Sequence, residues 1–154
     1  MNYEKEYDFV VKLLNKLSIQ TTIFNIDEGE SPKFDLGLRE TVYDENIYKK
    51  FFSSFPSTGK PNTIYHINDK FLCQYFAIQL PNNPGAYFMA GPYTDFLLTD
   101  EVILKLVDQY NLSPQIYAQL KKYYTRIPFI KDKEYLLSLF MTFGECLWDG
   151  VDNY

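Results

Sequence analysis

The spacing of apolar residues in the first third of the chain predicts two helices and a strand. From Tyr3 to Leu17 apolar side chains recur at every third or fourth position, which indicates an amphipathic helix. The segment Ile19 to Ile26 is rich in β-branched residues and predicts a strand. After an acidic, turn-prone loop, Asp44 is placed to cap a helix over residues 45–55.

The middle of the chain predicts three consecutive antiparallel strands, over residues 63–67, 70–80 and 86–90. The pair Asn68-Asp69 predicts a two-residue turn between the first two strands. Residues 81–85 (PNNPG) predict a longer turn before the third strand, which Gly91-Pro92 is expected to end.

These turns set which side chains share a face of the sheet. The tight turn places His66 opposite Phe71, and the longer turn places Ile78 opposite Phe88. One face then holds Tyr65, Leu72, Gln74, Phe76, Ile78 and Phe88, and the other holds Ile64, His66, Phe71, Cys73, Tyr75, Ala77, Tyr87 and Met89. Neither face is polar, so we expect both to be covered, in an α+β fold with an antiparallel sheet of about five strands flanked by helices. A one-residue slip in either turn would exchange the two faces.

The second of these faces combines ring hydroxyls, an imidazole and a thiol with apolar surface, which suits a cavity with polar groups. We therefore predict a ligand pocket lined by His66, Cys73, Tyr75, Tyr87 and Met89. Arg39 is one of only two arginines and could hold an anionic ligand there, the alternative being a surface salt bridge.

The last third of the chain predicts three helices. Thr99 or Asp100 can cap the first, and Ser113-Pro114 has the residues that open the second, which Pro128 stops. Asp132 can cap the last helix, which runs towards Trp148. In the second helix Tyr123 and Tyr124 fall on the apolar side, although with the neighbouring lysines they also resemble a basic-aromatic nucleic-acid stripe.

Composition places the chain among single globular domains. Its 154 residues are enough for one hydrophobic core, and 18% of them are aromatic, so few other stabilising devices are needed. A net charge of −5 argues against a nucleic-acid-binding surface on this segment. The acidic start and the lack of a long apolar run predict neither a signal peptide nor a membrane span. The expected compartment is therefore the cytoplasm, where Cys73 and Cys146 stay thiols, although a disulfide between them is open.

The residue types that carry catalysis are sparse. His66 and Cys73 would lie diagonally on one sheet face, so a thiolate–imidazole nucleophile is conceivable, but no carboxylate stands ready to orient the imidazole. One histidine and two distant cysteines do not make a metal site, and the isolated glycines make no phosphate loop. We expect no enzyme, no metal and no cofactor.

Several short motifs after Asp69 resemble a known family. The strand ending AYFMAGPYTDF, the helix TDEVILKLVDQYNLS, the segment KKYYTRIPFI and the ending ECLWDG resemble the N-terminal sensor region of AraC-type transcription regulators from Gram-positive bacteria. The resemblance covers about half of the chain and implies a PAS/GAF-like sensor module that signals to a C-terminal helix-turn-helix pair. It would make residues 1–154 a single sensor domain, with the DNA-binding part outside this chain.

Two functions follow as expectations. The first is a cytoplasmic, homodimeric regulatory domain that binds a small-molecule effector and passes a rearrangement through its last helix. The second is a stand-alone protein-interaction module whose aromatic residues only fill a core. An enzyme using His66 with Cys73, or a carboxylate pair, is a third reading.

Overall fold

The structure, a computed structural model, describes residues 4–25, 34–38, 42, 62–81 and 85–148. Its helices and strands, in chain order, are α1 (Glu4–Lys16), β1 (Thr21–Asn25), β2 (Ile64–Asn68), β3 (Gln74–Gln79), β4 (Ala86–Tyr93), α4 (Asp100–Gln109), α5 (Ile116–Thr125) and α6 (Lys133–Trp148). The α+β class is as predicted, and so are these helices and strands apart from their exact ends. The helix predicted over 45–55 lies outside the described residues.

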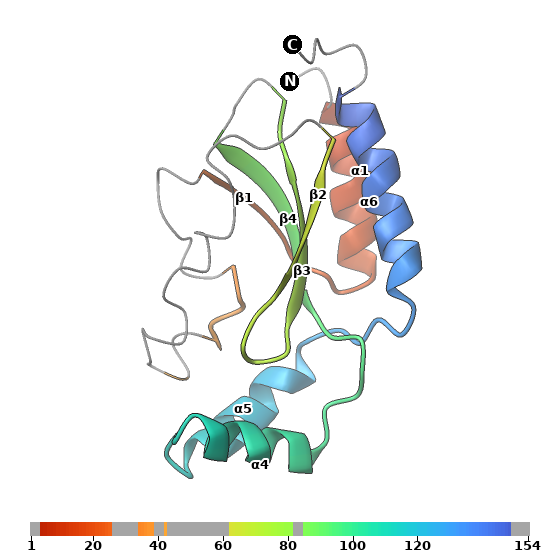
Figure 1. The fold of residues 1–154 in the computed structure, drawn as a ribbon. Helices are drawn as coiled ribbons and strands as arrows, with labels where there is room; N and C mark the ends of the chain where they lie inside the picture. The colour runs from red at the N-terminus through yellow and green to blue at the C-terminus, as the bar shows by residue number, and fades with distance from the viewer. Residues whose placement is uncertain (1–3, 26–33, 39–41, 43–61, 82–84, 149–154) are drawn as a thin grey trace.

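The four strands form one antiparallel sheet in the order β1-β4-β3-β2 (Figure 1). In the described part of the chain the sheet is thus smaller than the expected sheet of about five strands. The consecutive strands β1 and β2 lie at opposite edges of this sheet. Between them in the chain, Phe34, Leu38 and Val42 are buried in the same cluster as Tyr75 and Tyr87, so these described residues cover that face of the sheet.

The predicted pairing of β3 with β4 is confirmed. Ile78 lies opposite Phe88, and the Leu80 amide donates to the Ala86 carbonyl at 2.9 Å. The length of the connecting turn was enough to set this register because the two strands start immediately at its ends.

The predicted pairing of β2 with β3 is wrong. His66 lies opposite Phe76 and Ile64 opposite Ile78, because the connection spans 69–73 and is not a two-residue turn. Asp69 closes this longer loop: its amide donates to the Cys73 carbonyl at 2.8 Å, and its side chain holds two further amides. The shift of five residues is odd, so every side chain of β2 points to the opposite face from the one predicted.

The prediction that Gly91-Pro92 ends the third strand is also wrong, since β4 continues through this pair to Tyr93. Gly91 makes this path available: its φ of +145° strongly favours glycine, and a Cβ there would lie 2.7 Å from the Gln74 carbonyl oxygen. The register shifts at this point between Gln74 and Phe76, so the strand bulges and continues.

Each face of the sheet carries its own hydrophobic core. On one face α1 and α6 lie side by side and run in opposite directions (Figure 1), and their apolar sides pack on Phe76, Ile78 and Phe88. On the other face the buried residues of the β1–β2 connection pack on Tyr75 and Tyr87. Both faces are therefore covered, as predicted.

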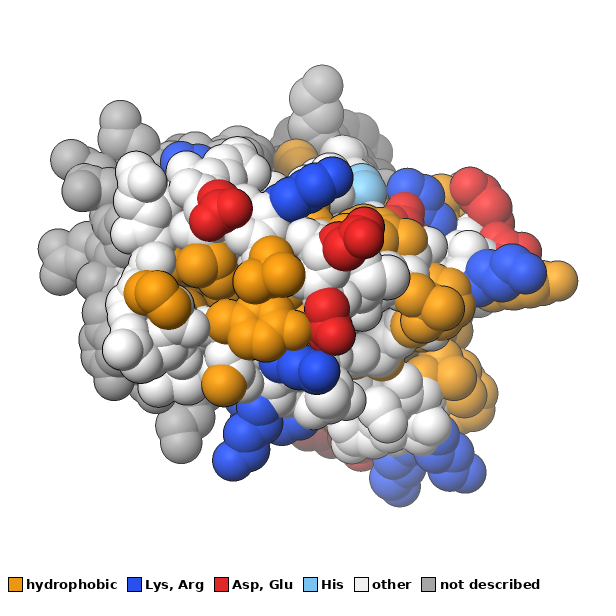
Figure 2. Space-filling view, turned by 90° about the horizontal axis from the view of Figure 1, so that it is seen from below, with side chains coloured by type: hydrophobic (Ala, Val, Ile, Leu, Met, Phe, Trp, Pro, Cys, Tyr) orange, Lys and Arg blue, Asp and Glu red, His pale blue; other side chains and the backbone are white. Residues whose placement is uncertain are grey.

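The α4–α5 pair lies beyond the end of the sheet, next to the β2–β3 loop (Figure 1). Thr99 caps α4 and Asp132 caps the start of α6, where its carboxylate accepts from the Glu134 amide at 3.1 Å. Seen from this end, exposed hydrophobic side chains are interspersed with lysine and acidic side chains (Figure 2). Tyr123 and Tyr124 are buried on the inner side of α5, so their rings are not exposed for stacking with bases.

Candidate functional site

Four of the six predicted pocket residues share one face of the sheet. Cys73, Tyr75, Tyr87 and Met89 belong to the same cluster and are each at most 1% exposed. Tyr75 packs against Phe34 with ring centroids 5.9 Å apart. Arg39, the fifth residue, lies outside the described residues.

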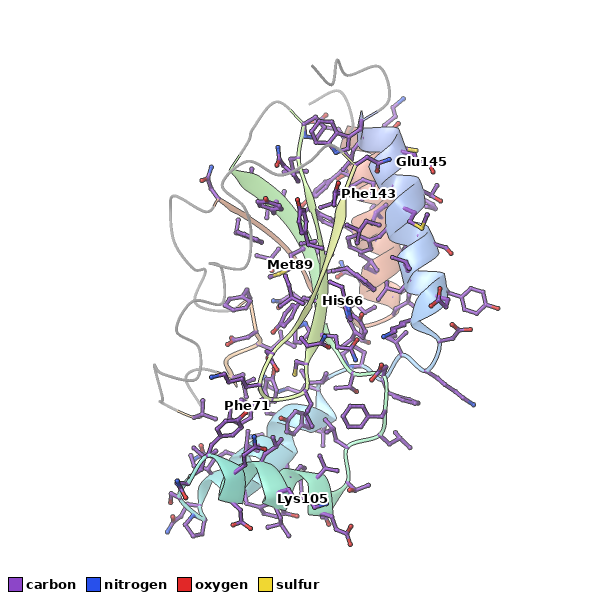
Figure 3. All side chains as sticks on the ribbon, in the orientation of Figure 1. His66, Phe71, Met89, Lys105, Phe143 and Glu145 are labelled. Atoms are coloured by element: carbon purple, nitrogen blue, oxygen red, sulfur yellow. The ribbon has the colours of Figure 1, made fainter. Side chains whose placement is uncertain are left out.

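His66, the sixth, does not join them. Because β2 is shifted, its imidazole lies on the α6 side of the sheet while Met89 lies on the other (Figure 3). It is exposed, its Nε2 is 2.9 Å from Gln74 Oε1, and its ring lies 4.9 Å from the ring of Phe76. The structure thus separates His66 from Cys73 and does not form the thiolate–imidazole pair considered from the sequence.

The predicted pocket face is filled by aromatic rings. Phe24 stacks on Tyr87 at 5.5 Å between centroids, and Tyr65 meets the same ring edge-on at 5.9 Å. Burial raises the pKa of the Tyr87 hydroxyl to about 12, with a further contribution from Tyr65. A small molecule bound among these residues would have to displace a ring such as Phe34, so binding would require the 34–38 segment to move.

A cluster of buried polar side chains lies where this face meets the α4–α5 pair. The Tyr123 hydroxyl donates to the Asp35 carbonyl at 2.8 Å, so its single proton is used, and the Cys73 thiol 3.7 Å away acts as donor to it. Burial, together with the nearby Asp69 carboxylate, raises the pKa of the Cys73 thiol well above its ordinary value. Cys73 is therefore a protonated, inaccessible thiol and a poor nucleophile.

Asp69 is the most perturbed acid of this cluster. Its Oδ1 accepts from the amides of Phe71 at 2.8 Å and Cys73 at 2.9 Å, whereas its Oδ2 is buried and accepts no hydrogen bond from the described residues. Burial, with a smaller contribution from Asp35, raises its pKa to about 7 against the lowering effect of the two amides. The effect of desolvation on this pKa is larger than that of the two hydrogen bonds because Oδ2 accepts none from the described residues.

The sequence predicts a turn at Asp69 and a pocket position at Cys73, and it places Tyr123 and Tyr124 on the apolar side of a helix or in a basic-aromatic stripe. It does not predict that these four side chains form one cluster. The available signal was local: an aspartate that starts a loop often accepts hydrogen bonds from amides a few residues later. The burial of Asp69 Oδ2, in contrast, depends on α4, α5 and the 34–38 segment, which are distant from Asp69 in the sequence.

A groove runs between α1 and α6 on the outer side of the pair. It has a volume of about 310 Å³ and is lined by Lys5, Glu6, Phe9, Val10, Leu139, Thr142, Phe143 and Cys146. Phe9 is 64% exposed at its edge. On α6, Leu139, Thr142 and Cys146 are spaced by three and four residues, so they form one stripe along the helix.

Comparisons of the chain with protein-family models, with curated proteins and with solved structures find no match. The resemblance to AraC-type sensors therefore stays a prediction from the motifs. Among the described residues no group of three or more His, Cys, Asp or Glu could hold a metal ion. In the same part of the chain no helix has both the length and the apolar character needed to cross a membrane.

Proposed function

We propose that this chain is the sensor domain of an AraC-type transcription regulator, with a PAS/GAF-like fold, and that it dimerises through α1 and α6. It acts from the cytoplasm, binds no DNA itself and signals to a DNA-binding domain outside this chain. It is not an enzyme.

The observation that carries this proposal is the position of β3 and β4 between the two cores. All six residues of β3 and all eight of β4 are buried. Alternate residues belong to alternate faces: Tyr75 and Ala77 contact one core, Phe76 and Ile78 the other. A rearrangement around Tyr75 would therefore shift the packing of α6, because tightly packed interiors transmit displacement.

The α1–α6 groove supports a second copy of this chain as its occupant. Lys5 and Glu6 both line the groove, so two copies related by a twofold axis can form two symmetry-related Lys5–Glu6 pairs beside the axis. The exposed ring of Phe9 lines the same groove as the Leu139, Thr142 and Cys146 stripe of α6 and provides a side chain that a partner groove can bury.

Substitution of Phe9 tests the dimer. We expect the wild-type chain to sediment as a dimer at micromolar concentration and Phe9→Glu to sediment as a monomer with unchanged circular dichroism. Leu97→Glu is the matched control, since Leu97 is 69% exposed but lies in the β4–α4 connection, away from the groove. A wild-type monomer at all concentrations, or a Phe9→Glu dimer, would contradict the proposal.

A reporter in cells tests the regulatory role. The chain is fused to a DNA-binding domain that represses only when dimeric, and repression is expected with wild type and Leu97→Glu but not with Phe9→Glu. Effector binding is expected to raise the melting temperature of the wild-type chain in a screen of small molecules.

The alternative, a protein-interaction module without a small-molecule ligand, has its own support. The four described pocket residues are packed against neighbouring rings with at most 1% exposure. If dimerisation is confirmed and no compound in the screen shifts the melting temperature, this alternative explains the structure better.

A further inference from the structure

Besides the apolar packing of α4 and α5 on Phe71 and its neighbours, three tyrosine hydroxyls attach the pair to backbone carbonyls of the rest of the domain. Tyr124 donates its hydroxyl proton to the Phe71 carbonyl at 2.7 Å, and Tyr110 donates to the Lys70 carbonyl at 3.2 Å. Tyr123 donates to the Asp35 carbonyl at 2.8 Å. The docking of the two helices therefore depends on the shape of the 69–73 loop, which supplies two of these three acceptors.

Asp69 sets the shape of that loop. Its Oδ1 holds the Phe71 and Cys73 amides, and its own amide donates to the Cys73 carbonyl at 2.8 Å. Within the loop Leu72 has a φ of 68°, a left-handed conformation that a leucine rarely adopts and that the surrounding bonds must maintain. A change in the hydrogen bonds of the Asp69 side chain therefore displaces the Lys70 and Phe71 carbonyls, which accept from Tyr110 and Tyr124.

The surroundings of Asp69 do not favour a negative charge. No lysine or arginine among the described residues forms an ion pair with it: Lys70 is exposed, and Arg126 lies 5.7 Å over the ring of Tyr123 with an Nη2 contact to the Leu36 carbonyl. The titratable groups that interact with it from the packed elements are Asp35 of the 34–38 segment, Cys73 of its own loop, Tyr110 at the C-terminal end of α4, and Tyr123 and Tyr124 of α5.

We propose that Asp69 is a proton-operated latch: with a proton on Oδ2 it holds the 69–73 loop against α4 and α5, and loss of that proton loosens their docking. The neutral acid keeps Oδ1 as acceptor for both amides and removes the buried charge. The ionised carboxylate has a lower free energy in water than in the buried cluster, and it reaches water only when the loop opens.

The buried environment supports this direction and gives a magnitude. The pKa of Asp69 is raised to about 7 in the docked state by burial, whereas an open loop returns it towards its ordinary value. The docked state therefore binds the proton more tightly and is favoured at low pH. With a docked pKa of about 7, the equilibrium constant for docking falls about tenfold between pH 6 and pH 8.

Amide hydrogen exchange of the full chain tests the latch. After correction for the intrinsic exchange rates, protection of the α5 amides is expected to fall about tenfold between pH 6 and pH 8. Amides of α1 and α6, which pack on the other face of the sheet, are the internal control and are expected to keep their protection. Constant protection in α5, or an equal loss in every helix, would overturn the proposal.

Two variants identify the group responsible. Asp69→Asn keeps an oxygen for the two amides but has no titration, so protection of α5 should be the same at both pH values. Asp108→Asn, which changes an exposed acid of α4, should retain the wild-type loss. A tenfold loss that survives in Asp69→Asn, or disappears in Asp108→Asn, assigns the effect to another group.

A direct titration of the wild-type chain covers the case in which Asp69→Asn does not fold. The carbon-13 chemical shift of the Asp69 carboxyl is expected to titrate with a midpoint near 7. A midpoint in the ordinary range of an exposed aspartate, about 4, would remove the physical basis of the latch. Neither experiment depends on dimerisation or on an effector, so the latch and the proposed function are tested separately.

Discussion

Removing the hydroxyl of Tyr124 tests whether the α4–α5 pair is held by tyrosine hydrogen bonds. In Tyr124→Phe the ring stays in the core and only the oxygen that donates to the Phe71 carbonyl at 2.7 Å is lost. This bond is buried, and its removal takes one donor from the Phe71 carbonyl, so the expected loss of unfolding free energy is about 0.5–1.5 kcal/mol. For a chain of 154 residues this corresponds to a fall in melting temperature of roughly 1–6 °C.

Urea unfolding followed by far-ultraviolet circular dichroism measures this loss. The matched control is Tyr135→Phe, since Tyr135 is 79% exposed on α6 and its hydroxyl should contribute little. We expect the urea midpoint to fall for Tyr124→Phe with an unchanged slope, and to stay at the wild-type value for Tyr135→Phe. Equal midpoints for the two variants would refute the reasoning, because they would show that the buried hydroxyl contributes no more than an exposed one.

Further predictions concern Gly91 and the two cysteines. Gly91→Ala should destabilise the domain by roughly 3–5 kcal/mol, because its φ is unfavourable for alanine and its Cβ would press on the Gln74 carbonyl and the Tyr75 ring. Its urea midpoint should lie well below that of Gly85→Ala, whose Cβ would lie nearest to the end of the Asn25 side chain. In the monomeric Phe9→Glu variant, where the α1–α6 groove is open, a thiol reagent should modify one cysteine of the native chain and both after unfolding, because Cys146 is exposed and Cys73 is buried. Rapid modification of both native thiols in this variant would contradict this packing.

Local signals in the sequence determined most of the helices and strands of the described chain. Thr99 and Asp132 cap helices because a side-chain oxygen near a helix start can accept from an unpaired amide whatever surrounds it. The apolar stripes also placed Tyr123 and Tyr124 on the inner side of α5. The β3–β4 register followed from a turn whose length is visible in the sequence.

Tertiary structure decided the points at which these local rules were insufficient. The pair Asn68-Asp69 is a good tight turn by composition, but the longer loop is preferred because Phe71 and Cys73 become buried against α4 and α5. That choice moved His66 to the opposite face of the sheet and separated it from the other predicted pocket residues. Gly91-Pro92 likewise interrupts an isolated strand, yet β4 passes through it because the Gly91 amide pairs with the Gln20 carbonyl at 2.9 Å.

At Asp69, neighbouring residues determine the hydrogen bonds and the tertiary structure determines the pKa. Its place at the start of a loop and its side-chain bonds to nearby amides depend on neighbouring residues and can be read from the sequence. Its raised pKa depends on burial beneath α4 and α5 and on Asp35, which is 34 residues away in the chain. Desolvation is a property of the assembled interior, so only the folded chain determines where a proton is held.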